Sequence, residues 1–485
     1  MKSLKDILFG VSLIEIHGDR DQQVAAITFD SRSVDKGSLF IAIVGLMTDG
    51  HQFIGQSIKA GATAIVCEEL PEDLKEGITY VVVENSAASL GIIADNFYDH
   101  PSRKLSLVGI TGTNGKTTMA TLLYELFKEL GYKVGLLSTV ENKIDDKIAP
   151  AKFTTPDSIQ LNQLMAEMVK AKCTHCFMEV SSHALVQHRV NGLTFTGGIF
   201  TNITHDHLDY HNTFEEYIKA KKLLFDQLPA EAFALVNQDD RRGTVMLQNT
   251  KASKNTFSLK GMADFRAKVI HNTLQGLELD LDGVSAWFKL IGDFNAYNLL
   301  GVYAAGVLLE EDKDEVIRCL SNLDGARGRF EQVGNNKNIL AIIDYAHTPD
   351  ALENVLKTIE KLRSNKEVLI TVVGCGGNRD KTKRPVMGKL AASYSNKVIL
   401  TSDNPRDEDP TTIMEEMKAG IAKTDQRKTM MIQDRREAIR TACNMAGPED
   451  IILVAGKGHE TYQEIKGERH HFDDREVLIE MLSDN

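Results

Sequence analysis

Short apolar runs separated by glycine and charge occupy the first hundred residues, at positions 39–44, 62–66 and 80–83. Runs of this length are typical of buried strands. A further run, "LSLVGIT" (105–111), leads through a glycine-rich turn into a segment with apolar residues at three- and four-residue steps. This spacing predicts an amphipathic helix that stops at Gly131. Its apolar positions are Met119, Leu122, Leu123, Leu126, Phe127 and Leu130.

Two more buried strands are predicted in the middle of the chain, at "HCFMEV" and "GGIFTNI". Beyond residue 331, "ILAIID", "EVLITVVG", "KVILTSD" and "DIILVAG" alternate with helical patterns such as "TTIMEEMKAGIAK". Strands that alternate with helices predict a parallel sheet covered on both faces. We therefore expect a Rossmann-like region at the C-terminus.

A polar segment, "DNFYDHPSRK" (95–104), contains Pro101 and is predicted to be a linker. A chain of 485 residues is long enough for about three domains. The sequence thus predicts an α/β protein with domains at residues 1–102, 103–331 and 332–485.

The composition excludes several classes of protein. A content of 42% hydrophobic and 26% charged residues is that of a globular protein, and a net charge of −12 argues against a general nucleic-acid binder. The sequence has no signal-peptide pattern and no apolar run of about 18 residues, so neither secretion nor membrane insertion is expected. Six cysteines in so long a chain favour a reducing cytoplasm. Cys173 and Cys176 form an isolated "CTHC" pair, which favours buried structural thiols over a metal site.

The turn after the fourth run reads "GITGTNGKTT" (109–118). The generic phosphate loop G-x-x-x-x-G-K-[ST] has its first glycine five residues before the second, where this chain has Ile110. Gly112 and Gly115 still allow backbone N–H groups to face a phosphate at the start of a helix. A nucleoside triphosphate site is predicted, and the alternative is a plain turn with a solvated lysine.

"TGTNGKTT" resembles the phosphate loop of the Mur ligase family, whose members add amino acids to the peptidoglycan precursor of the cell wall. The resemblance continues in order along the whole chain. It is carried by "FTTPDS", "MEVSSHALVQHRV", "FTNITHDHLDYH", "KAKKLLF", "FNAYNLLGVYAA", "GARGRFE", "DYAHTPD", "GCGGNRDKTKRP", "SDNPRDEDP" and "AGKGHETYQ".

The resemblance is strongest to the branch that adds diaminopimelate. It implies an N-terminal uridine-nucleotide-binding domain, a central P-loop ATPase-type domain with a parallel sheet, and a C-terminal amino-acid domain. The implied reaction joins meso-2,6-diaminopimelate to the D-glutamyl carboxylate of UDP-N-acetylmuramoyl-L-alanyl-D-glutamate through an acyl phosphate, with ATP consumed. A cytoplasmic monomer that needs Mg2+ is expected.

The family pattern also assigns the ATP site. Asn298 resembles the adenine contact, and Arg329 and Asp344 resemble residues that close over the phosphates and ribose. For Arg329 an interdomain salt bridge is the alternative. The implied ATP-binding set is Gly112, Thr113, Asn114, Gly115, Lys116, Thr117, Thr118, Asn298, Arg329 and Asp344.

By the same resemblance, the catalytic residues are Lys116, Glu179, His207 and Lys221, and the Mg2+ ligands are Thr117, Glu179, His207 and Lys221. The resemblance implies that Lys221 is carbamylated to N6-carboxylysine, because an ammonium group cannot ligate a cation. From the residues alone, Glu179 could pair with an arginine, His207 could belong to a hydrogen-bonded cluster, and Lys221 could be part of a solvated helix face.

The muramoyl-dipeptide substrate is implied to contact Phe29, through its backbone, and Ser31, Thr154, Thr155, Ser181, Gln187 and Arg189. One departure from the family pattern lies at "GLMTDG", where "GHQADG" is common. Leu46 and Met47 cannot donate side-chain hydrogen bonds, so uridine contacts there must come from the backbone or from elsewhere.

The implied diaminopimelate set is Arg379, Asp403, Asn404, Pro405, Arg406, Asp407, Gly456 and Glu460. Arg406 follows a proline and offers a planar fork for the far carboxylate that lysine lacks, while Glu460 suits an ammonium group. The alternative is a turn that carries a solvated charge run. Two other functions stay open: a folylpolyglutamate synthase, and a nucleotide-dependent switch or binding module.

Overall fold

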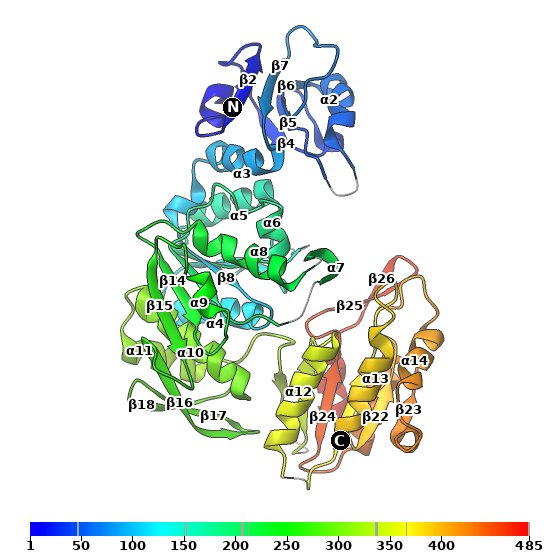
Figure 1. The fold of residues 1–485 in the computed structure, drawn as a ribbon. Helices are drawn as coiled ribbons and strands as arrows, with labels where there is room; N and C mark the ends of the chain where they lie inside the picture. Colours follow the sequence, from blue (N-terminus) through cyan, green and yellow to red (C-terminus); the bar gives the residue numbers. More distant parts are fainter. Residues whose placement is uncertain are drawn as a thin grey trace. The chain divides into compact units, whose positions relative to one another are not determined.

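The computed structural model describes residues 1–45, 48–149, 151, 153–204, 208–211, 213–334, 338–364 and 366–483 (Figure 1). The chain forms two compact α/β units. The first comprises Met1–Ala267 and Tyr297–Leu320, and the second comprises Lys268–Ala296 and Ser321–Asn485.

The N-terminal part of the first unit is a five-stranded sheet in the order β2-β7-β6-β5-β4, with only β2 antiparallel to its neighbour. Three of these strands confirm the apolar runs predicted in this region. Side chains alternate between two buried cores, so that Tyr80 and Val82 pack with α2 while Val81 and Val83 pack with α1 and α3. The elements are β1 (Lys2–Ser3), α1 (Leu4–Ile7), β2 (Leu13–His17), β3 (Gln23–Val24), β4 (Ala26–Thr28), β5 (Ser38–Ile41), α2 (Ile54–Ala60), β6 (Ala62–Cys67), β7 (Thr79–Val83) and α3 (Ser86–Phe97).

The predicted linker is only partly irregular. Asp95 and Asn96 lie in the last turn of α3 and are buried. The Asn96 side-chain amide donates to the carbonyls of Ile7 (2.8 Å) and Phe9 (2.7 Å), and the Asp95 carboxylate lies 2.6 Å from His100 Nδ1. These polar residues serve the N-terminal core, which local polarity could not reveal.

The rest of the first unit is built on parallel strands in the order β9-β12-β8-β13-β14-β15, with β10 and β11 at one edge and the start of β16 at the other. Its elements up to β13 are β8 (Ser106–Thr111), α4 (Lys116–Glu129), β9 (Val134–Leu137), β10 (Asn142–Ile144), β11 (Lys147–Ala149), α5 (Ser158–Lys170), β12 (His175–Glu179), α6 (Ser182–Val186) and β13 (Gly197–Phe200). There follow α7 (Leu208–His211), α8 (Phe214–Asp226), β14 (Phe233–Asn237), α9 (Gly243–Met246), β15 (Ser253–Ser258), β16 (Phe265–Thr273), α10 (Asp293–Leu308) and α11 (Lys313–Asn322).

Helix α4 has the apolar face that the sequence predicted. Met119, Leu122, Leu123, Leu126 and Phe127 are buried, and Gly131 takes a φ of +93° just beyond the end of the helix. Cys173 and Cys176 are free and buried, as expected. Among the described residues, no helix combines the length and apolar character that crossing a bilayer requires.

The second unit contains a six-stranded sheet in the order β19-β20-β24-β21-β22-β23, parallel except for β19. Its elements are β17 (Gly276–Leu281), β18 (Val284–Phe288), β19 (Glu331–Val333), β20 (Leu340–Asp344), α12 (Pro349–Leu362), β21 (Leu369–Val373), α13 (Lys383–Tyr394), β22 (Lys397–Leu400), α14 (Pro410–Ala419), β23 (Thr429–Met431), α15 (Arg435–Met445), β24 (Ile451–Ala455), β25 (Tyr462–Ile465), β26 (Glu468–His471) and α16 (Asp474–Ser483).

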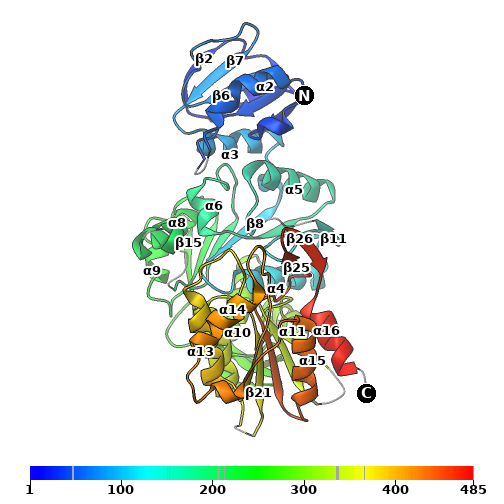
Figure 2. The same ribbon diagram turned by 90° about the vertical axis from the view of Figure 1, so that its right-hand side faces the viewer.

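Both faces of this sheet are covered, which explains why its strands are continuously apolar. In β24, Ile451 and Leu453 pack with α12, α13 and α14, whereas Ile452 and Val454 pack with α15 and α16. Figure 2 shows α13 on one side of the sheet and α15 and α16 on the other. The Rossmann-like arrangement predicted for the C-terminus is confirmed.

A buried ion pair joins α15 to α16. Arg435 Nε and Nη2 donate to the two carboxylate oxygens of Asp474, each at 2.7 Å, and Nη2 also donates to the Ala455 carbonyl at the end of β24 (3.2 Å). Both charged side chains are fully buried. Such a pair is not itself a large source of stability, but the removal of one partner leaves the other charge buried without a counter-charge.

We therefore expect Asp474→Asn to lower the free energy of unfolding of the second unit by about 3–5 kcal/mol. Urea unfolding measures the change. The control is Glu480→Gln, which removes the partner of the half-exposed Arg436 and should change stability by less than about 1 kcal/mol. Equal effects of the two substitutions would contradict the expectation.

Candidate active site

The phosphate loop leaves β8 at Thr111 and enters α4 at Lys116. Gly112 and Gly115 have φ values of +150° and +87°, and a Cβ on Gly112 would lie 1.9 Å from Thr201 Oγ1. The ammonium group of Lys116 donates to the carbonyls of Gly112 and Thr113, both at 2.9 Å. The loop therefore has the curled backbone and the placed lysine that phosphate binding requires.

Two residues that sequence reasoning left without a role brace this loop. Thr201 and Asn202 directly follow β13, the neighbour of β8. Thr201 Oγ1 donates to the Asn114 carbonyl (2.6 Å), and the Asn202 carbonyl accepts from Thr113 N (2.8 Å). Their position directly after a predicted strand could have indicated this role, because ligand-binding loops follow the carboxyl ends of parallel strands.

Glu179 ends β12 beside the phosphate loop and is fully buried. Its Oε2 accepts from Thr117 Oγ1 (3.0 Å) and from Thr139 Oγ1 (3.2 Å), while Oε1 accepts from the backbone N–H of Thr139 (2.8 Å). These bonds satisfy a buried charge that would otherwise be costly. The alternative pairing of Glu179 with an arginine does not occur among these contacts.

Lys221 lies on α8 and is buried, so it does not belong to a solvated helix face. Its Nζ donates to the Gly112 carbonyl (2.8 Å) and lies 4.4 Å from the centre of the Tyr217 ring. The neighbouring Lys222 pairs instead with Asp226. The fold thus brings Lys221, rather than Lys222, to the phosphate loop.

The oxygen donors in this region fit a magnesium ion. Thr117 and Glu179 offer a hydroxyl and a carboxylate, the kind of ligand that Mg2+ prefers. Lys221 fits such a site only as a carbamate, because its ammonium form would repel the cation. His207 lies outside the described residues, and within those residues no cluster of three or more His, Cys, Asp or Glu side chains could hold a metal.

Five of the seven residues predicted to contact the muramoyl-dipeptide substrate, all except Phe29 and Ser31, lie together next to Glu179. Thr155 Oγ1 donates to the Glu179 carbonyl (2.9 Å), and Arg189 Nη1 donates to the Thr155 carbonyl (2.7 Å). Gln187 Oε1 accepts from Arg189 Nε and Nη2. Two further contacts complete the group, from Thr139 Oγ1 to Thr154 Oγ1 (3.1 Å) and from Ser181 N to Thr155 Oγ1 (3.1 Å).

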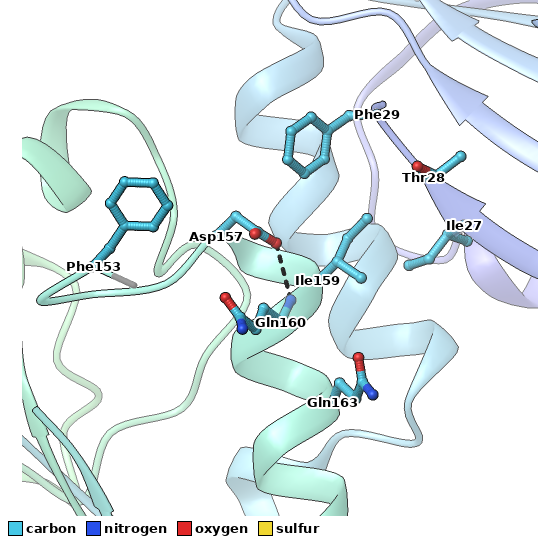
Figure 3. A pocket seen from close by; sticks show the side chains of 8 residues that line it. All are labelled: Ile27, Thr28, Phe29, Phe153, Asp157, Ile159, Gln160 and Gln163. Atoms are coloured by element: carbon cyan, nitrogen blue, oxygen red, sulfur yellow. Dashed lines mark hydrogen bonds between the residues drawn. The ribbon is translucent and has the colours of Figure 1, made fainter. Parts of the chain in front are cut away.

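A cavity of about 380 Å³ opens between the end of β4 and the start of α5 (Figure 3). Phe29, which the resemblance predicts to contact uridine, lines the cavity, whereas Ser31 is not among its lining residues. Phe153 and Asp157 line it as well, and sequence reasoning missed both; Asp157 also caps α5 by accepting from Gln160 N (2.9 Å). The lining consists of Ile27, Thr28, Phe29, Phe153, Asp157, Ile159, Gln160 and Gln163. Leu46 and Met47 lie outside the described residues.

Asn298, on α10 in the first unit, approaches the phosphate loop, since a Cβ on Gly115 would lie 2.6 Å from its Oδ1. In the second unit, Asp344 ends β20, and its Oδ2 accepts from Phe330 N (2.7 Å). Burial raises the pKa of Asp344 to about 6, although the nearby charge of Arg329 opposes the shift. The Arg329 guanidinium lies 4.7 Å from the centre of the Tyr345 ring.

The predicted amino-acid residues follow the carboxyl ends of three adjacent parallel strands. Arg379 is exposed in the loop after β21, residues 403–407 follow β22, and Gly456 and Glu460 follow β24. Carboxyl ends of parallel strands form the usual binding edge of such sheets. The strand order β24-β21-β22 therefore gathers segments that are far apart in sequence.

Arg406 is held in a left-handed conformation with a φ of +51°. Its backbone N–H donates to the Glu464 carbonyl (3.0 Å), and its carbonyl accepts from Lys466 N (2.8 Å), so the β25–β26 hairpin fixes this backbone. Its Nη1 donates to the Gly377 carbonyl (2.8 Å), and Nε lies 3.3 Å from the Glu464 carboxylate. Within the described residues, Nη2 makes no hydrogen bond, which leaves one edge of the fork for a ligand.

Of the three acidic residues after Arg406, Asp407 and Asp409 are exposed and Glu408 is half-buried. Glu408 accepts from both Nη1 (3.0 Å) and Nη2 (2.9 Å) of the buried Arg384, which lowers the pKa of Glu408 to about 2. Asp407 accepts from Asn378 Nδ2 (2.6 Å), and Asp409 caps α14. Asp407 and Glu408 thus link the loops after β21 and β22 through Asn378, while the exposure of Asp407 and Asp409 leaves the turn alternative open.

A phosphate loop with a buried carboxylate against its threonine is typical of proteins that use a nucleoside triphosphate. Three family models narrow this class. The Mur ligase family catalytic domain matches residues 23–98, the Mur ligase middle domain matches 110–306, and the Mur ligase glutamate ligase domain matches 328–458. The chain belongs to the Mur ligase family, with its three domains in order.

Similar proteins cover the full chain. The UDP-N-acetylmuramoyl-L-alanyl-D-glutamate–2,6-diaminopimelate ligase of Cytophaga hutchinsonii is 61% identical over 480 residues, covering 99% of each chain. The ligase of the same name from Phocaeicola vulgatus is 53% identical, again with 99% of each chain covered. A solved structure of a ligase of that name superimposes with a TM-score of 0.72 at 33% identity, covering 99% of both chains.

The raised pKa of Asp344 makes stability depend on pH. Between the ordinary value of 3.8 and the folded value of about 6, the folded protein binds more protons than the unfolded chain, so stability falls as pH rises through that range. Asp344→Asn removes the free-energy cost of burying an ionised carboxylate at this position. We expect it to raise the unfolding temperature at pH 7.5 by about 2–6 °C and to give no gain at pH 4.

Thermal unfolding at the two pH values measures this effect. The exposed Asp314→Asn is the control, and it should change neither midpoint. A variant that is less stable at pH 7.5 would mean that the attraction of Arg329 for the carboxylate outweighs the cost of burial.

Proposed function

We propose that the protein is an ATP-dependent, ADP- and phosphate-forming ligase of peptidoglycan precursor synthesis. It joins meso-2,6-diaminopimelate to the D-glutamyl carboxylate of UDP-N-acetylmuramoyl-L-alanyl-D-glutamate. The relatives from Cytophaga hutchinsonii and Phocaeicola vulgatus are named as ligases of UDP-N-acetylmuramoyl-L-alanyl-D-glutamate and 2,6-diaminopimelate. We infer that the reaction takes place in the cytoplasm and that the enzyme acts as a monomer.

The observation that carries the choice of amino acid is the setting of Arg406. Its guanidinium is held by Gly377 and Glu464 at the carboxyl end of the C-terminal sheet, and its Nη2 makes no hydrogen bond within the described residues. Meso-diaminopimelate differs from lysine chiefly by a second carboxylate, which a guanidinium binds with two parallel hydrogen bonds. Glu460 supplies the opposite charge for the ammonium group beside that carboxylate.

Activation of the glutamyl carboxylate takes place at the phosphate loop. Lys116 and the backbone N–H groups of the loop bind the triphosphate, and the γ-phosphoryl group passes to the carboxylate to give an acyl phosphate and ADP. The diaminopimelate amine then attacks the acyl carbon, and the tetrahedral intermediate expels phosphate as the amide forms. Arg329 is proposed to offset the charge on the transferred group.

We assign the metal ligands as Thr117, Glu179, His207 and Lys221, the last as N6-carboxylysine. Mg2+ bound there would neutralise charge on the phosphates and polarise the phosphoryl oxygens. The contacts of Thr117 and Lys221 with the Glu179 carboxylate and the Gly112 carbonyl support this assignment.

We propose that the dipeptide chain of the nucleotide substrate lies along Thr154, Thr155, Ser181, Gln187 and Arg189, and that its uridine lies near Phe29 and Ser31. The position of this cluster beside Glu179 supports the first assignment. The cavity lined by Phe29 supports the second. We retain residues 1–102, 103–331 and 332–485 as the proposed domain boundaries.

Two other functions are less well supported. A folylpolyglutamate synthase should lack the N-terminal substrate domain and the Asp-Asn-Pro-Arg sequence, and this chain has both a match over residues 23–98 and Arg406. A nucleotide-dependent switch is also less well supported, because it does not need the charged residues that the loops after β21, β22 and β24 bring together.

The proposal predicts that phosphate release depends on the amino acid offered. With ATP and the muramoyl-dipeptide nucleotide, meso-diaminopimelate should support turnover, while L-lysine or no amino acid should give rates at least about 100-fold lower, because the acyl phosphate finds no bound acceptor. A coupled phosphate assay measures this. Equal ATP consumption without an acceptor would overturn the assignment.

Arg406→Ala should raise the KM for meso-diaminopimelate by about 100-fold or more, the loss expected for a charge-assisted bidentate contact. It should also reduce the preference over lysine. Steady-state kinetics with both amino acids provides the measurement, and Arg440→Ala on the exposed side of α15 is the matched control. An unchanged preference would rule out Arg406 as the specificity residue.

A further inference from the structure

A fully buried lysine lies beneath the proposed amino-acid site. Lys457 is the second residue after β24, and its side chain is 0% exposed. Its Nζ donates to Asn404 Oδ1 and to Glu460 Oε2, both at 3.1 Å, and lies 5.5 Å from the centre of the Tyr462 ring. A buried ammonium group is costly unless it is paired and hydrogen-bonded. Because Lys457 gains nothing from water, we look for its role in the two side chains that it contacts.

Lys457 determines which way the Asn404 side chain faces. Asn404 Oδ1 accepts from Lys457 Nζ and from the backbone N–H of Glu464 (2.9 Å), two groups that can only donate. The amide nitrogen must therefore point the other way, and it donates to Glu460 Oε2 (2.8 Å). A reversed amide would place donor against donor on one side and acceptor against acceptor on the other.

The same network reaches the arginine that is proposed to read the substrate. Asn404 lies two residues before Arg406, and Glu464 contacts both, through its N–H to Asn404 and through its carbonyl and carboxylate to Arg406. Gly456 permits the loop after β24 to approach Asp403 in the loop after β22 closely. It has a φ of +116°, and a Cβ there would lie 2.7 Å from Asp403 Oδ2.

The carboxylate of Glu460 is thereby held by one of its oxygens. Oε2 accepts hydrogen bonds from both Lys457 and Asn404, whereas among the described residues Oε1 accepts only a long one, of 3.5 Å, from the Tyr345 hydroxyl. An anchored oxygen fixes the direction of the second, which can then meet an ammonium group at a defined place. Without the lysine, Glu460 would lose its only ion-pair partner among the described residues.

We propose that Lys457 is a positioning residue for the amino-acid substrate. It holds Asn404 and Glu460 in the one arrangement that receives the ammonium group next to the carboxylate bound by Arg406. This inference rests on the proposed function, and it adds a specificity determinant that does not itself touch the substrate.

Lys457→Met keeps the length of the side chain and removes the charge and the donors. We expect the KM for meso-diaminopimelate to rise about 10- to 100-fold, with the KM values for ATP and for the nucleotide substrate within about two-fold of wild type. Lys457→Gln, which keeps one donor, should give an intermediate KM. Lys389→Met, a charge removal at an exposed position of α13, is the matched control and should leave all three KM values unchanged.

A double-mutant cycle separates positioning from simple loss of stability. If Lys457 acts through Glu460, the doubly substituted Lys457→Met/Glu460→Gln enzyme should have about the same KM for diaminopimelate as Glu460→Gln alone. Additive effects, or a fall in thermal stability with no change in this KM, would overturn the proposal. If Lys457→Met does not fold, the same comparison is made with Lys457→Gln.

The wild-type enzyme in the same assay distinguishes a failure of the proposed function from a failure of the role assigned to Lys457. Should wild type show no dependence on diaminopimelate, the proposed function fails. Should wild type depend on it while both Lys457 variants retain the normal KM, only the role of Lys457 fails.

Discussion

Buried charge at the carboxyl ends of two parallel sheets is the constraint on which both candidate sites depend. An ion removed from water costs several kcal/mol unless oppositely charged or hydrogen-bonding groups meet it. Glu179 is met by the hydroxyls of Thr117 and Thr139. Lys457 is met by Asn404 and Glu460. The need to satisfy these charges ties loops from different strands into one fixed arrangement, and that arrangement is the site.

In the candidate C-terminal site, local backbone strain falls on the residue that we propose to set specificity. Arg406 adopts a left-handed backbone that a residue with a Cβ takes only at some cost. Two backbone hydrogen bonds to the β25–β26 hairpin offset that cost. The pairing of Arg384 with Glu408 fixes the other side of the same loop. The side chain that we propose to discriminate between two similar amines is therefore supported from both directions.

Much of the fold could be predicted from local pattern. The apolar face of α4 follows from periodicity. Short apolar runs indicated some buried strands of both large sheets, namely β8, β12, β13, β20, β21, β22 and β24, but not others such as β9 and β14. The predicted linker was partly wrong, since Asp95 and Asn96 lie in α3 and are buried, and Asn96 donates to the distant carbonyls of Ile7 and Phe9. In the candidate sites, resemblance to the family supplied residues such as Arg406 and Glu460, but it gave no role to Thr201, Phe153 or Lys457.

The sequence by itself determined the class of fold, the phosphate loop and the types of side chain available for the chemistry, because these depend on residues close together in the chain. Only the tertiary structure decided which charges are buried and with whom they pair. Lys221 and Lys222 are neighbours in sequence, yet the rotation of α8 turns one to the phosphate loop and the other to Asp226. Likewise, the sequence does not show that Glu408 pairs with the buried Arg384 or that Asp407 contacts Asn378, since these pairings are set by distances between strands that the sequence does not contain.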